Sequence, residues 1–153
     1  MKLTRQKLSV LIIALLAVGL IALGVAYGKL AEENRYIIRS IDDRMTGSFV
    51  DVIQSRFHDV EGMDEESLQR LYRDSAGSAY LAFTLFNISS YQENHELNRI
   101  LYALHQWSEE GALFERLDLE TADELNRLVA QNQLDDPEQI HRAYEMMFGQ
   151  DGT

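Results

Sequence analysis

The hydrophobic pattern of the chain changes character once, near residue 28. From Leu8 to Tyr27 the sequence is an apolar run without a charged residue, and Ser9 is its one clearly polar side chain. At about 1.5 Å per residue, a helix of this length matches the hydrocarbon core of a bilayer, which is about 30 Å thick. We therefore predict a transmembrane helix over residues 8–28.

Charges on the two sides of this run indicate its orientation. Three basic residues and no acid precede it, namely Lys2, Arg5 and Lys7, and every Asp and Glu follows it. Short basic flanks remain in the cytoplasm. We expect residues 1–7 to be a short cytoplasmic tail and residues 29–153 to be an extracytoplasmic domain.

A cleaved signal peptide is the alternative interpretation of the first 28 residues. The segment Gly24-Val25-Ala26 resembles a cleavage site with small residues. However, the apolar region of a signal peptide is usually about 7–15 residues long, and this run is longer. Its length favours an uncleaved signal anchor.

Beyond residue 28 the pattern becomes amphipathic with a helical period. Apolar residues at successive i+4 steps form one face: Ile37, Ile41, Met45, Phe49, Ile53 and Phe57. A heptad register through Ile38, Ile41, Met45 and Val52 would place Ser48 and Ser55 in the seam. We expect the first helix to continue toward Val60 and to pack on its own domain instead of forming a long coiled-coil stalk.

Start and stop signals divide the rest of the chain into further helices. Acidic residues after Asp64 favour a helix start there, Thr121-Ala-Asp-Glu124 matches a capping box, and Asp136-Pro137 places proline at a first helical position. Gly111 and Gly149 are natural stops. The predicted helices cover residues 64–88, 93–110, 112–119 (a short piece), 121–130 and 137–148.

Together these patterns predict an all-α fold. One N-terminal transmembrane helix continues into a small extracytoplasmic bundle of about four to five helices. The predicted outer region of about 125 residues has the size of one ordinary domain. Within it, we expect Asp123 to pair with Arg127 at i+4 on one helix.

Charge and composition narrow the classes of partner and chemistry. After Leu30 the chain carries 25 carboxylates, ten arginines and no lysine, a formal balance of −15. Such a surface repels nucleic acid and anionic lipid headgroups. The chain has no cysteine, which excludes thiol catalysis, iron–sulfur clusters and thiolate zinc sites.

No motif in the sequence assembles a catalytic or metal centre. The segment His95-Glu96-Leu97-Asn98-Arg99 resembles a zinc-protease helix until its last position, where a cation replaces the second ligand. The four histidines are scattered, and neither a G-x-S-x-G turn nor a glycine-rich phosphate loop occurs. We predict no catalytic residue, no cofactor and no metal site.

Two sets of residues are candidates for binding. Gly24 and Gly28 form a G-x-x-x-G pair near the end of the predicted span, a spacing that lets two membrane helices approach closely. Four aromatic residues are candidates for a pocket in the bundle: Tyr72, Tyr80, Tyr102 and Trp107.

These features lead to two functional hypotheses. The first is a non-enzymatic, single-pass membrane protein of a bacterial cell envelope. Its partners are the lipid bilayer and either another protein or a second copy of the chain, bound through the membrane helix. Its acidic domain supports a membrane complex. The second is a sensor-like ectodomain that binds a small molecule among the four aromatic residues. The first hypothesis expects a filled core with an exposed apolar patch, and the second expects a deep aromatic cavity.

Overall fold

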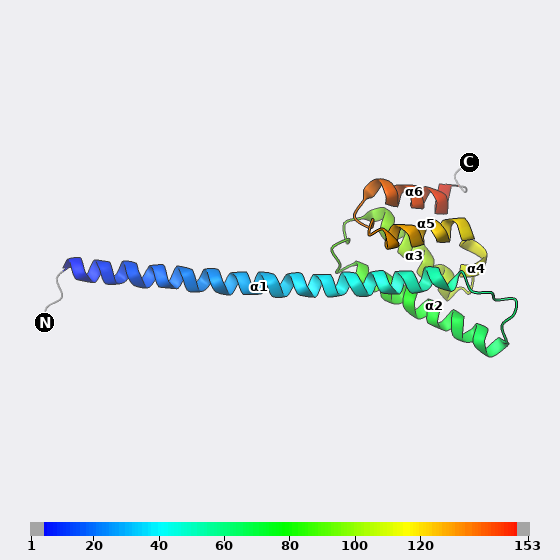
Figure 1. Ribbon diagram of the computed structural model, residues 1–153, viewed down its shortest axis with the longest axis horizontal. Helices are drawn as coiled ribbons and strands as arrows, with labels where there is room; N and C mark the ends of the chain where they lie inside the picture. Colours follow the sequence, from blue (N-terminus) through cyan, green and yellow to red (C-terminus); the bar gives the residue numbers. More distant parts are fainter. Residues whose placement is uncertain (1–4, 150–153) are drawn as a thin grey trace. The chain divides into compact units, whose positions relative to one another are not determined.

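The computed structural model describes the backbone of residues 5–149 and the side-chain surroundings of residues 16–149. These residues form helices and no strand (Figure 1). In chain order the helices are α1 (Arg5–Ser55), α2 (Glu65–Phe86), α3 (His95–Glu109), α4 (Leu113–Arg116), α5 (Leu119–Ala130) and α6 (Pro137–Phe148). The prediction of an all-α chain, with a first helix followed by about four to five more, is confirmed.

The chain divides into two compact units between Ile37 and Ile38. In the part of the chain that the structure describes, no helix is long and apolar enough to cross a membrane. The first part of the predicted span, residues 8–15, lies outside the residues whose side chains are described. The transmembrane assignment of residues 8–28 therefore stays a prediction.

Helix α3 is central to the unit that begins at Ile38. It contacts α2, α4 and α6, and α6 also contacts α5. The buried core draws on all of these helices and on the last turns of α1. Its largest fully buried side chains are Met45, Phe49, Ile53, Phe86, Leu97, Ile100, Leu101, Leu104, Leu113, Leu117, Leu125 and Leu128. The unit thus has a single core.

Helix α1 ends at Ser55, earlier than the predicted end near Val60. The two ends of the predicted apolar face, Ile37 and Phe57, are 54% and 47% exposed, so only its middle part is buried. Ser48 is buried within that part, and the buried Ser55 hydroxyl donates a hydrogen bond to the carbonyl of Val52 at 2.6 Å. Packing of this segment on its own domain is confirmed.

Two hydrogen bonds join α1 and the turn after it to distant parts of the same unit. The carboxylate of Asp42 accepts a hydrogen bond from the backbone N–H of Ser90 at 2.8 Å. Beyond the end of the helix, Nε of Arg56 donates to the carbonyl of Leu117 at 2.5 Å. The buried stretch between them is therefore held at both ends by polar contacts as well as by the core.

Aspartate or asparagine caps the start of each longer helix after α1. Asp64 accepts a hydrogen bond from the backbone N–H of Ser67 at 2.8 Å, and Asn94 accepts one from Leu97 at 3.0 Å. Asp136 caps α6 in the same way, with proline at the first helical position. The predicted starts at Asp64 and Asp136 are confirmed. Each cap satisfies a backbone donor that the first helical turn leaves unpaired.

The predicted start of α5 at Thr121 is wrong. The helix begins at Leu119, and Asp118 accepts hydrogen bonds from both the backbone N–H and the hydroxyl of Thr121, each at 2.8 Å. These bonds lower the pKa of Asp118. Because the Thr121 hydroxyl is a donor to Asp118, it does not serve as the capping acceptor that the sequence pattern suggested.

Left-handed residues end α3 and α5. Gly111 has φ +70°, and the N–H of Ala112 donates to the carbonyl of Trp107 at 2.8 Å. Asn132 has φ 53°, and the next residue donates to the carbonyl of Leu128 at 2.9 Å. Both are Schellman-type ends, in which glycine or asparagine adopts the left-handed conformation at low cost. The predicted stop at Gly111 is confirmed.

Candidate functional site

The two glycines of the predicted membrane contact lie on α1. Apart from the adjacent residues and backbone of its own helix, a β-carbon at Gly24 or at Gly28 would meet no described atom within 4 Å. The face that they form is therefore open in the single chain. Their role in contact with a second helix stays a prediction.

The four aromatic residues of the predicted pocket do not share a cavity among those described here. Tyr80 and Tyr102 are 58% and 52% exposed, and both rings lie beside the aromatic pair Phe83 and His105. Tyr72 packs edge-on against Phe114, with ring centres 5.2 Å apart. The four side chains therefore divide among separate surroundings.

Trp107 is the one of the four that borders a described cavity. Its ring lies 6.4 Å from that of Phe148, and these two residues line an open cavity of about 470 Å³ with Arg116 and Met147. Arg116 is already paired with the Glu110 carboxylate at 3.4 Å. The cavity lies between the end of α3 and the end of α6.

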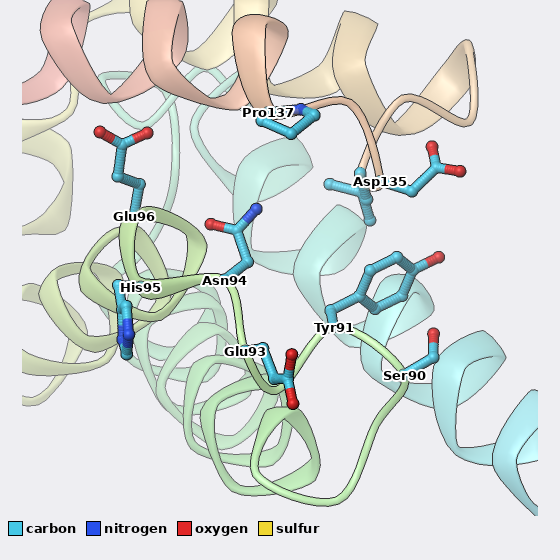
Figure 2. Close-up of a pocket in the computed structure, with 9 residues that line it drawn as sticks. Ser90, Tyr91, Glu93, Asn94, His95, Glu96, Asp135 and Pro137 are labelled. Atoms are coloured by element: carbon cyan, nitrogen blue, oxygen red, sulfur yellow. The ribbon is translucent and has the colours of Figure 1, made fainter.

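A groove of about 490 Å³ lies where two connecting segments meet, at the starts of α3 and α6. We call it the loop groove (Figure 2). Its lining residues are Ser90, Tyr91, Glu93, Asn94, His95, Glu96, Leu134, Asp135 and Pro137. In Figure 2, Tyr91 and Asn94 point toward the segment that carries Asp135 and Pro137, whereas His95 points away from it.

The loop groove is electrically negative. Three of its lining residues are acids, Glu93, Glu96 and Asp135. Burial raises the pKa of the Tyr91 phenol, and the negative charges of Asp42, Asp135 and Asp43 raise it further. With an aromatic ring, a leucine and a proline beside these carboxylates, the groove combines apolar contact area with negative charge.

One edge of the loop groove is held by an ion pair between α3 and α6. Nδ1 of His141 lies 2.8 Å from the Glu96 carboxylate. The hydrogen bond and the negative charge of Glu96 raise the pKa of His141 above its ordinary value of 6.5. This contact joins residues 45 positions apart in the sequence.

The pH dependence of stability follows from this ion pair. Its contribution is fully present below pH 6.5 and is lost as the pH rises through the higher pKa of the folded state. We expect His141→Gln to lower the melting temperature more at about pH 6 than at about pH 9, because the wild-type imidazole is neutral at the higher pH. Melting curves of the full chain in mild detergent at the two pH values measure this. The control variant is His95→Gln, at an exposed position, whose effect on the melting temperature should be the same at both pH values. An equal loss of melting temperature at both pH values for His141→Gln would contradict the prediction.

A second network, between α5 and α6, centres on a buried carboxylate. Glu124 accepts hydrogen bonds from Nη2 and Nε of Arg127 at 2.6 and 2.9 Å, and Nε of Arg142 lies 3.4 Å away. Arg127 also donates to Gln139 at 3.1 Å. The predicted pairing of Asp123 with Arg127 is wrong, because Asp123 faces solvent while Glu124 faces α6.

Within the described residues, no three His, Asp or Glu side chains converge as metal ligands. The polar networks instead join helices to one another, as Glu96 does with His141 of α6 and Glu124 of α5 does with Arg142 of α6. The loop groove is the site that sequence reasoning missed, since its residues come from two connecting segments with no motif of their own. Comparison of the chain with protein-family models, curated proteins and solved structures finds no match.

Proposed function

We propose that the protein is a non-enzymatic, single-pass membrane protein whose acidic helical domain binds a partner protein or supports a membrane complex. In this proposal residues 1–7 lie in the cytoplasm, residues 8–28 form the signal anchor, and residues 29–153 form the extracytoplasmic domain. The basic residues before the apolar run and the acids after it support this orientation.

The observation that carries the proposal is the exposure of apolar side chains on α1. Leu20, Ile21 and Leu23 are 68–70% exposed, and Leu16, Val18 and Val25 are also exposed. At about 100° per residue these side chains point to all sides of the helix. A helix that is apolar all round belongs in a protein core or in a membrane, and the described part of the chain leaves these side chains exposed.

The loop groove supports the second part of the proposal, partner binding. It is an open surface with apolar contacts around Tyr91 and a negative rim, so it suits a basic segment of another protein. The small-molecule alternative would need a cavity shared by Tyr72, Tyr80, Tyr102 and Trp107. Of the cavities described above, only one has a member of this set, Trp107.

Membrane fractionation tests the anchor. We expect the full chain to remain in the membrane pellet after extraction with alkaline carbonate, because an inserted helix resists this treatment. Replacing both Leu16 and Leu20 by arginine should release it, since each charge costs about 2.5–3.5 kcal/mol at the centre of a membrane helix. The control variant is Glu32→Arg with Glu33→Arg, outside the proposed span. Extraction of the wild-type chain by carbonate would contradict the anchor.

Photo-crosslinking in native membranes tests the partner. A photoreactive amino acid at Glu93, on the loop groove, should give one adduct of constant mass, identified by mass spectrometry. The same amino acid at Gln69, an exposed position on α2, should not give this adduct. Adducts of the same mass from both positions, or none from Glu93, would contradict binding at the groove.

A further inference from the structure

We infer that two copies of this chain associate in parallel through one face of α1. This face, which we call the seam, consists of Leu16, Leu20, Leu23, Tyr27, Leu30, Asn34 and Ile37. Its parallel direction rests on the proposed membrane anchor, because two copies inserted in the same way have their helices aligned. The inference names the partner of this part of the chain as a second copy.

The spacing of the seam is that of a coiled coil. Successive members are separated alternately by four and three residues, and this alternation is unbroken over about three heptads. Every member is exposed in the single chain, including Tyr27 at 76% and Leu30 at 55%. The part beyond residue 28 is the most informative, because there apolar residues are no longer present on all sides.

Charge is excluded from the seam in that part. Between Tyr27 and Ile37, the charged residues are Lys29, Glu32, Glu33 and Arg35, and none of them occupies a seam position. Leu30 and Ile37 are large apolar side chains of the seam, 55% and 54% exposed in the described part of the chain, and Tyr36, 76% exposed, lies off the seam. Exposed apolar side chains in such a row mark a contact surface.

Asn34 is the one polar member of the seam. It falls at an a position if Leu30 and Ile37 are taken as d positions. A single asparagine at an a position pairs with the same residue of a second, parallel helix, which favours two strands and fixes their register at some cost in stability. The position of Asn34 thus favours a second copy over an unrelated helix.

The contact between two copies has two parts. The seam residues from Leu16 to Tyr27 lie in the proposed span, where packing between helices replaces contact with lipid and displaces no water. Leu30 and Ile37 lie beyond the span, where burial between two copies removes apolar area from water. The seam therefore joins the helices by close packing in the bilayer and by apolar burial next to it.

The glycine pair defines a different face of the same helix. At about 100° per residue, Gly24 and Gly28 continue through Arg35, and this face lies about 100° around the helix from Tyr27 and Leu30. Association through the glycines would thus bring Arg35 of the two copies together, whereas association through the seam brings Leu30, Asn34 and Ile37 together. The two arrangements therefore predict different crosslinked positions.

Single-cysteine crosslinking of the full chain in membranes makes this test direct, because the protein has no cysteine of its own. A disulfide forms only when two α-carbons lie within about 7 Å. We expect Leu30→Cys, Asn34→Cys and Ile37→Cys to give several-fold more covalent dimer under copper–phenanthroline than the matched controls. The controls are Lys29→Cys, about 120° around the helix from both faces, and Gly28→Cys and Arg35→Cys, on the glycine face.

Each outcome decides the inference. Dimers at the seam positions support it; dimers mainly at Gly28→Cys and Arg35→Cys, equal dimer at all positions, or no dimer would overturn it. The alkaline carbonate extraction of the same membranes reports on the anchor separately. If the chain stays in the membrane but gives no seam dimers, the seam is refuted and the anchor is not. If carbonate extracts the chain but seam dimers form, the anchor is refuted and the seam is not.

Discussion

Phe49→Ala lowers the free energy of unfolding of the domain by about 3–5 kcal/mol, the largest stability effect that we expect from a single substitution. The Phe49 ring is fully buried where α1 meets the core. Truncation removes apolar area from the folded state and leaves a cavity that the surrounding side chains only partly fill. Because the free energy of unfolding of a domain is only about 5–15 kcal/mol, this substitution would remove a large part of it. Urea unfolding of the full chain in mild detergent, followed by circular dichroism, measures the change.

Phe57→Ala is the matched control for this substitution. Phe57 is the same residue type at the same i+4 spacing, but it is 47% exposed beyond the end of α1. We expect it to cost less than half as much as Phe49→Ala, because much of its ring is already in water. Equal losses for the two variants would show that the C-terminal part of α1 is not packed as described.

Glu124→Gln is expected to cost about 1.5–3 kcal/mol, the usual contribution of hydrogen bonds to charged groups. The Glu124 side chain is 8% exposed and binds Arg127 and Arg142 between α5 and α6. The amide keeps the size of the side chain but removes its charge and one acceptor. The two arginines would then lose their shared counter-ion; they are 33% and 65% exposed, so water compensates for part of the loss.

The pH dependence of Glu124→Gln gives a second, independent measurement. The hydrogen bonds from Arg127 lower the pKa of Glu124 below its ordinary value of 4.5. Its contribution is therefore present above pH 4.5 and is lost as the pH falls through the lower pKa of the folded state. The difference between the wild type and Glu124→Gln should shrink toward acid pH. Asp123→Asn, one residue earlier and exposed, should change stability by less than about 0.5 kcal/mol; an equal effect there would assign the pairing to Asp123 instead.

Local signals were sufficient for most of the helices. Asp64 and Asp136 act within three residues along the chain, so their capping hydrogen bonds depend on little beyond sequence. At α5 two local signals compete, because both Asp118 and Thr121 are good capping residues. Sequence alone does not rank them. In the structure Asp118 is the cap, because it accepts hydrogen bonds from both the backbone N–H and the hydroxyl of Thr121.

The loop groove illustrates what a single sequence lacks. Tyr91 and Asp135 lie in separate connecting segments, and their proximity depends on how α3 and α6 pack. The same holds for Glu96 and His141, which are 45 residues apart. Neither pair has a periodic or motif signal. By contrast, the spacing of the seam on α1 is visible in the sequence. Only the exposure of its side chains in the structure distinguishes it from an apolar face that packs on its own domain.

The division between the two units falls inside α1, between Ile37 and Ile38, instead of in a loop. A soluble fragment that starts at the first turn, after Ser55, would therefore lack Met45, Phe49, Val52 and Ile53 and would leave the core open on one side. A protease that cuts between residues 30 and 37 would instead leave a fragment with every core side chain retained. Two cuts in the same helix, a few turns apart, would thus have opposite consequences: one before Met45 leaves the core complete, and one after Ile53 removes a wall of it.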